Sequence, residues 1–217
     1  MRSVALLLPA LVAASPVAQV VGYDGWANSP DPNDIKIEQV SFSGSGCPQG
    51  SVSTNISPDK TVITFGFDQF QTYIGPGTLR SDWTKNCQLH LTLSYPGGFQ
   101  FSILESTYHG YAQLEAGVTG TFFSTYYFSQ DAYATTTTTT SITGGPLWEN
   151  GQVYTKTDQI PTASYIFSPC GSSGILNINN RIALSSTNSS ASGTLTDDDA
   201  TVAFTQQVNI AWRPCKE

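Results

Sequence analysis

Hydrophobic and polar residues alternate most regularly between residues 86 and 111. Every second residue from 89 to 93 is leucine, and every second residue from 99 to 103 is phenylalanine or isoleucine. A period of two is typical of a strand with one buried face. The intervening Tyr95-Pro96-Gly97-Gly98 supplies a preset φ and two residues that tolerate positive φ. The pattern predicts a central hairpin of two strands joined at a turn.

Shorter segments of the same kind follow along the chain. Strands are predicted for residues 35–43, 51–56, 61–67, 117–129, 153–157, 175–184 and 201–212. The change of parity between Ile37 and Val40 indicates a β-bulge in the first of them. The six threonines at 135–140 are compatible with a strand or a loop, and residues 188–199 are interpreted as a polar connection. Because no helical period persists over three turns, we expect an all-β, single-domain antiparallel β-sandwich or jelly-roll-like fold.

The first residues have the character of a secretory signal peptide. Arg2 precedes an apolar run over residues 4–14 that is too short to span a bilayer, and small residues follow it. We predict a signal peptide within residues 1–18, cleaved after Ala14 or Ala18, an extended arm over 19–34 and the domain over 35–217. A secreted protein, located outside the cell or in the cell wall and without membrane insertion, is the expected result.

Four cysteines, an even number in a secreted chain, predict two disulfides. Three connectivities are possible. We favour Cys47–Cys87 and Cys170–Cys215, because each pair closes a loop within one half of the chain. Metal binding by the cysteines is the alternative, but no Cys-x-x-Cys motif is present, so no metal site is expected. No cofactor is expected either.

The charge balance disfavours one class of partner. The chain has 16 acidic and 9 basic residues, a formal net charge of -7, and only 12% of its residues are charged. Nucleic acid is therefore not an expected partner, since scattered basic residues cannot neutralise a phosphate backbone. Ser, Thr, Asn, Gln and Gly must supply most of the polar surface.

Six ordered motifs carry a resemblance to a known family. They are Gly46-Cys47-Pro48-Gln49-Gly50-Ser51-Val52, Asn86-Cys87-Gln88-Leu89, Tyr95-Pro96-Gly97-Gly98-Phe99-Gln100-Phe101, His109-Gly110-Tyr111-Ala112-Gln113-Leu114, Ser168-Pro169-Cys170 and Leu176-Asn177-Ile178-Asn179. From about Ile35 to Cys215, the chain resembles the secreted, largely fungal family catalogued as domain of unknown function 4360. The resemblance implies a secreted, disulfide-bonded, mostly β domain, and it implies no settled activity.

Three carboxylates are candidates for catalysis: Glu105, Glu115 and Asp68. A glycosidase needs two carboxyl groups about 5 to 10 Å apart across a cleft. Glu105 has the parity of the apolar residues before it, which would place its carboxylate on the apolar face. The alternatives are a bulge near Ser106 that turns Glu105 to solvent, or an arginine partner such as Arg80 or Arg181.

An aromatic cluster supplies the candidates for ligand binding: Tyr108, Tyr111, Tyr126 and Tyr127. Where two aromatic residues are consecutive in a strand, as in Phe122-Phe123 and Tyr126-Tyr127, one ring must face outward. Exposed tyrosine rings can stack on sugars or anchor a protein partner. The alternative is packing alone. His90 alternates outward with its neighbours and is expected on the surface.

Two sequons predict N-glycosylation, at Asn55 and Asn188, and the threonine run could carry O-linked sugar if it is exposed. Asp197-Asp198-Asp199 is interpreted as a solvated acidic turn in preference to part of a Ca²⁺ site.

Three functional hypotheses follow. The first is a non-catalytic glycoprotein that binds cell-wall or host surface components, with a polysaccharide or an extracellular protein as partner. The second is a carbohydrate-active hydrolase that uses Glu105 with another carboxylate. The third is an effector or structural interaction protein. The oligomeric state is not indicated by the sequence.

Overall fold

The structure is a computed structural model that describes residues 28–171, 173–196 and 204–215. The predicted signal peptide, part of the predicted arm and the acidic run at 197–199 lie outside these residues. Among the described residues, no helix is long and apolar enough to cross a membrane.

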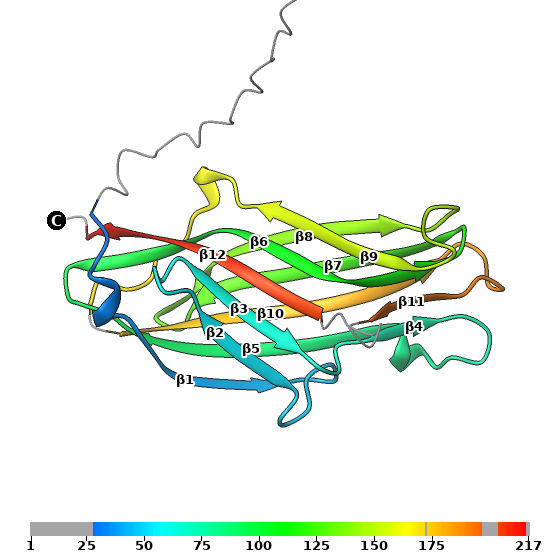
Figure 1. Cartoon of the computed structure of the whole chain (residues 1–217), viewed down its shortest axis with the longest axis horizontal. Helices are drawn as coiled ribbons and strands as arrows, with labels where there is room; N and C mark the ends of the chain where they lie inside the picture. Colours follow the sequence, from blue (N-terminus) through cyan, green and yellow to red (C-terminus); the bar gives the residue numbers. More distant parts are fainter. Residues whose placement is uncertain (1–27, 172, 197–203, 216–217) are drawn as a thin grey trace, which may run out of the picture.

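Twelve strands and three short 3-10 helices make up the described chain (Figure 1). The strands are β1 (Lys36–Ser43), β2 (Val52–Ile56), β3 (Val62–Phe67), β4 (Thr72–Ile74), β5 (Thr84–Ser94), β6 (Phe99–Leu114), β7 (Val118–Phe128), β8 (Asp131–Thr143), β9 (Gln152–Gln159), β10 (Ser173–Ser186), β11 (Gly193–Thr196) and β12 (Phe204–Pro214). The helices are η1 (Pro32–Asp34), η2 (Arg80–Asp82) and η3 (Thr162–Ser164).

The strands form two antiparallel sheets that pack as a sandwich, which confirms the predicted fold class. Sheet A has the order β1-β5-β10-β7-β8. Sheet B has the order β2-β3-β12-β6-β11-β4, and β9 pairs with the other edge of β6. The alternating apolar residues of both sheets meet in the core, where Leu89, Leu91 and Leu93 of β5 are fully buried.

The predicted central hairpin is wrong, although both of its strands exist. β5 belongs to sheet A and β6 to sheet B, so the turn between them crosses from one layer to the other. The two apolar faces meet across the core instead of lying side by side in one sheet. Tyr95, at the crossing, is buried, and its ring packs 5.2 Å from Trp212 and 5.7 Å from Phe101 between centroids.

Bulges explain two irregularities of the sequence pattern. The predicted bulge in β1 is confirmed between Ile37 and Gln39. In β6, Ile103 pairs with Ile210 and Glu105 pairs with Asn209, so Leu104 is an extra residue. This bulge returns Glu105 to the outer surface, because one added residue exchanges the two faces of a strand.

Three segments between the predicted strands also pair, and one of them is the three-residue strand β4. The threonine run lies in β8, where Thr136 and Thr138 are buried and the alternate threonines are exposed. The segment interpreted as a polar connection, residues 188–199, contains β11, so that interpretation is wrong for Gly193–Thr196. The four residues pair with β4 and β6, and so brief a strand has too few alternations to show in the sequence.

Both favoured disulfides are present. Cys47–Cys87 joins the loop after β1 to β5, and Cys170–Cys215 joins the loop before β10 to the residue after β12. The second bond therefore ties the two sheets together at one end of the sandwich.

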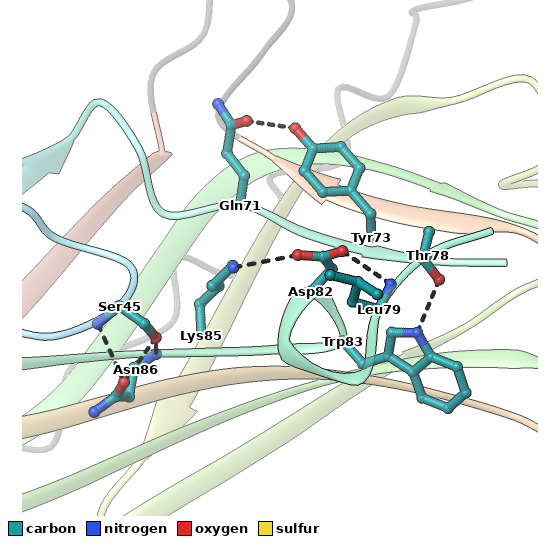
Figure 2. Close-up of polar contacts among 9 residues, drawn as sticks. All are labelled: Ser45, Gln71, Tyr73, Thr78, Leu79, Asp82, Trp83, Lys85 and Asn86. Atoms are coloured by element: carbon teal, nitrogen blue, oxygen red, sulfur yellow. Dashed lines mark hydrogen bonds and ion pairs between the residues drawn. The ribbon is translucent and has the colours of Figure 1, made fainter.

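The loop that leads into β5 is held by side-chain hydrogen bonds (Figure 2). The indole Nε1 of Trp83 donates to Oγ1 of Thr78 at 2.9 Å. At the start of β5, Oδ1 of Asn86 accepts from Oγ of Ser45 at 2.8 Å. The hydrogen bond from Ser45 fixes Asn86 at the edge of the surface described next.

Candidate functional site

The outer surface of sheet A carries a regular array of polar and aromatic side chains. Register places His90, Asn177 and Tyr127 in one row across β5, β10 and β7. Two further rows follow along the same strands. We call the array the amide face, and its nine residues are Asn86, Gln88, His90, Phe123, Thr125, Tyr127, Asn177, Asn179 and Arg181. Asn177 is 2% exposed, so it holds its neighbours in place and does not itself reach a surface ligand.

Hydrogen bonds hold the first row in place. Nδ1 of His90 lies 2.5 Å from Oδ1 of Asn177, and Nδ2 of Asn177 donates to Oγ of Ser129 at 2.8 Å. The amide nitrogen of Asn177 also faces the carbonyl oxygens of Tyr127 and Ile175, so its oxygen is the acceptor for Nδ1 of His90. In the next row, Nε2 of Gln88 donates to the hydroxyl of Tyr127 at 3.2 Å. The array is therefore preorganised.

Two clefts open over the amide face. One of about 430 Å³ lies over His90, Tyr127 and Asn177. The other, of about 490 Å³, is lined by residues of the second and third rows, among them Asn179 and Arg181. Both run along β10, so one elongated ligand could contact both.

The electrostatics of this face differ from those of the whole chain. The protein has a net charge of -7, yet none of the nine residues is Asp or Glu. The guanidinium carbon of Arg181 lies 4.1 Å from the centroid of the Phe123 ring, which is a cation–π contact. The face therefore offers amide, hydroxyl, imidazole and aromatic groups with little charge, a set that suits a neutral, hydroxyl-rich ligand.

The four predicted tyrosines separate into three places. Tyr127 is on the amide face. Tyr111 is half-buried on the outer surface of sheet B, against Gly151. Tyr108 and Tyr126 are 2% and 0% exposed and lie in the core. They do not reach a surface ligand, so the prediction that they bind one is wrong. One ring of each consecutive pair does face outward, as predicted, namely Phe123 and Tyr127.

The two buried tyrosines belong to a polar network between the sheets. The Tyr108 hydroxyl donates to Oγ of Ser124 at 2.6 Å, and Nε2 of Gln206 donates to the Tyr126 hydroxyl at 3.2 Å. Nδ2 of Asn180 donates to Oε1 of Gln206 at 2.6 Å, and Oγ of Ser124 donates to Oδ1 of Asn180. Burial raises the pKa of Tyr126 well above its usual value, so this hydroxyl stays protonated. The network joins β6, β7, β10 and β12 beneath the amide face.

The three candidate carboxylates do not converge. Glu105 lies in β6, and Glu115 directly follows the end of that strand, ten residues further on. At the usual rise of a strand, the two residues are about 30 Å apart. Register places Asp68 level with residue 111 of β6, about 20 Å along the sheet from Glu105. Separations of this size are too large for the carboxyl pair of a glycosidase.

Two of the three carboxylates accept hydrogen bonds that serve the fold. Glu105 accepts from Nδ2 of Asn209 at 3.1 Å, within a cleft of about 890 Å³ on sheet B. Glu115 accepts from the backbone N–H of Ser192 at 2.8 Å, which fastens the turn between β6 and β7. Neither proposed arginine reaches Glu105, because Arg80 stacks on Trp83 and Arg181 stacks on Phe123.

One further carboxylate, Asp158, lies near Glu105 on the neighbouring strand β9. Burial raises its pKa, and hydrogen bonding by Thr140 opposes that shift. Gln159 pairs with Glu105, so alternation directs Asp158 to the opposite side of sheet B. The two carboxylates therefore do not face one cleft.

The remaining predicted sites lie at the surface. Asn55, on β2, and Asn188, between β10 and β11, are both exposed. Within the described ranges, no group of three or more His, Cys, Asp or Glu side chains could hold a metal ion.

Sequence reasoning missed the polar residues of the amide face, above all Gln88, Asn177 and Asn179. Their outward parity in β5 and β10 was visible. Nothing in the sequence indicated that these two strands, far apart along the chain, lie side by side.

Solved structures that align with this chain include carbohydrate-binding modules. TmCBM61, in complex with β-1,4-galactotriose, aligns with a TM-score of 0.25 and 9% identity, over 89% of this chain and 100% of that chain. The family 11 module of Clostridium thermocellum, in complex with a β-1,3-1,4-mixed-linked tetrasaccharide, has a TM-score of 0.24 and 15% identity, over 84% of this chain and 97% of that chain.

A relative by sequence comes from the fungus Arthroderma benhamiae and is described as an uncharacterized secreted protein. It is 43% identical over 192 residues, which cover 88% of this chain and 76% of the relative. The predicted secretion is confirmed by this relative. Residues 33–215 also match the family described as Domain of unknown function (DUF4360). The chain belongs to this family.

Proposed function

We propose that this protein is a secreted, non-catalytic carbohydrate-binding protein that holds a neutral cell-wall polysaccharide on the amide face. The observation that carries the proposal is the array itself, two aromatic rings among amide side chains without a carboxylate. The two clefts along β10 give the face the elongated shape that a polymer needs.

The chemistry of the face matches that of a sugar. Each hydroxyl of a sugar both donates and accepts hydrogen bonds, and amide side chains also do both. The apolar side of a pyranose ring packs on aromatic rings. Tyr127 and Phe123 are four residues apart on one side of β7, about 13 Å, so they could contact separate sugars of one chain.

The charge pattern favours a neutral ligand. A net charge of -7 repels anionic polymers at long range, and the face itself offers a single arginine that is already stacked on a ring. A neutral polysaccharide avoids that repulsion and can still be held by short-range contacts.

The test is depletion of the secreted, disulfide-bonded protein from solution by insoluble chitin, cellulose and β-glucan. One polymer is expected to deplete the protein selectively. Tyr127→Ala is expected to weaken that binding about tenfold or more, which corresponds to about 1.4 kcal/mol.

Tyr111→Ala is the matched control, since Tyr111 is also a half-buried tyrosine but lies on the outer surface of the opposite sheet. It is expected to bind as the unchanged protein does, and circular dichroism checks that both variants fold. Retention of full binding by Tyr127→Ala contradicts the assignment of the face. Failure of every polymer to deplete the protein contradicts polysaccharide binding and favours a protein partner.

A further inference from the structure

Strand β8 is an edge of sheet A. Its residues Thr135 to Thr143 pair with β7 in unbroken register over nine residue pairs. In the part of the chain that the structure describes, no strand pairs with its other side. The stretch contains no Pro, Asp, Glu, Lys or Arg. A long, regular, uncharged edge is a template for pairing with another strand.

The other edge strands carry features that oppose such pairing. β1 has a bulge and two charged residues, Lys36 and Glu38. β2 and β4 are five and three residues long. β9 has Lys156 and Asp158. Charges, bulges and short length are the usual means by which proteins protect sheet edges. The residues of β8 itself lack all of them over the paired stretch, and the one carboxylate beside it is that of Asp158 on β9, which hydrogen-bonds to Thr140 at one position of the edge.

The sequence of β8 also complements itself. Residues 135–140 are all threonine, so antiparallel pairing of two copies would set threonine opposite threonine. The same contact already occurs inside the molecule, where Oγ1 of Thr125 lies 3.0 Å from Oγ1 of Thr137. Oγ1 of Thr121 likewise lies 3.2 Å from Oγ of Ser141. Cross-strand pairs of this kind stabilise sheets.

We propose that β8 pairs antiparallel with β8 of a second copy of this chain, about a twofold axis perpendicular to sheet A. The same patch serves both copies, as a twofold interface requires. The two sheets A then form one continuous sheet, and both amide faces lie on the same side of it.

The dimer has a consequence that rests on the proposed function. Two linked binding faces raise the effective concentration of the second face once the first has bound a polymer. The dimer therefore binds an insoluble polysaccharide more tightly than the monomer does, whereas a short soluble oligosaccharide, which reaches one face only, is bound equally by both.

The test measures the mass of the secreted protein in solution by light scattering after size-exclusion chromatography. A loading concentration of about 100 µM is suitable, because a one-strand interface is small and reversible. We expect a dimer that dissociates on dilution. Thr137→Lys, at an exposed position in the middle of the edge, is expected to be monomeric under the same conditions.

Thr121→Lys is the matched control. It adds the same charge on the same side of the neighbouring strand β7, which is not an edge, at a residue outside the amide face, and this variant should remain dimeric. A monomer at all concentrations, with or without O-linked sugar on the threonines, overturns the proposal. So does a Thr137→Lys variant that stays dimeric. Because no polysaccharide is present, failure of this test is distinguishable from failure of sugar binding.

Discussion

At the scale of single residues, two tyrosines in the same core differ in what their hydroxyl groups contact. The Tyr108 hydroxyl lies in the polar network, 2.6 Å from Oγ of Ser124 and 3.1 Å from Oγ1 of Thr138. The Tyr154 hydroxyl is buried and has no hydrogen-bond partner among the described residues, while its ring packs 5.2 Å from that of Phe122. A buried hydroxyl without a hydrogen-bond partner destabilises the folded state, whereas a hydrogen-bonded hydroxyl stabilises it.

Removing each hydroxyl should therefore change stability in opposite directions. Tyr154→Phe is expected to raise the free energy of unfolding by about 1 kcal/mol, because it deletes an unsatisfied polar group. Tyr108→Phe is expected to lower it by about 1 to 2 kcal/mol, because it leaves network partners unpaired. Urea denaturation of both variants measures the two changes. A loss of stability for Tyr154→Phe would show that its hydroxyl is satisfied.

The residue scale also accounts for Glu105. Its parity with Phe101 and Ile103 predicts an inward carboxylate, and the extra residue Leu104 reverses that orientation. The sequence allowed a bulge near Ser106 as one explanation for Glu105. The structure does contain a bulge, but its extra residue is Leu104, which precedes Glu105.

At the scale of elements, the two disulfides differ in exposure. Cys47 and Cys87 are each 1% exposed, whereas Cys170 is exposed and Cys215 is half-buried. The separations of 40 and 45 residues imply similar loop entropies, about 4 kcal/mol for each bond. The two disulfides should therefore differ more in how easily a reductant reaches them than in how strongly they restrict the unfolded chain.

Mild reduction of the folded protein should open Cys170–Cys215 first, because a thiolate must reach the sulfur that it attacks. Alkylation after brief exposure to a low concentration of reductant, followed by peptide mass spectrometry, identifies the labelled cysteines. Equal labelling of all four cysteines at the earliest time would mean that global unfolding, and not exposure, controls reduction.

At the scale of the whole molecule, buried tyrosines link stability to alkaline pH. Burial raises the pKa of both Tyr126 and Tyr154 well above the ordinary value of about 10. The unfolded chain ionises these groups near pH 10, while the folded chain keeps their protons. Because the folded state then binds more protons than the unfolded state, stability is retained below pH 10 and falls as the pH rises above it.

The expected fall is about 1.4 kcal/mol per pH unit for each tyrosine, between its unfolded and folded pKa. Denaturant titrations between pH 8 and 11 measure it. Tyr154→Phe should show a shallower decline than the unchanged protein. A free energy of unfolding that stays constant through this range would contradict the burial of these groups.

Several features were determined by the sequence alone. Alternation located most strands, the parity change in β1 located its bulge, and consecutive aromatic pairs required outward rings at Phe123 and Tyr127. The cysteine spacing favoured the two disulfides that form. These features are local, or depend on loop length, so they can be derived without knowing which strands are neighbours.

The neighbours were decided only by the tertiary structure. A period of two says which residues share one side of a strand, but it does not say which other strand lies beside it. β5 and β6 therefore looked like a hairpin and belong to different sheets, while β5 and β10, far apart in the chain, became partners. The amide face and the edge at β8 exist only through that pairing, because it is the packing of the whole apolar core that selects among the possible orders of strands.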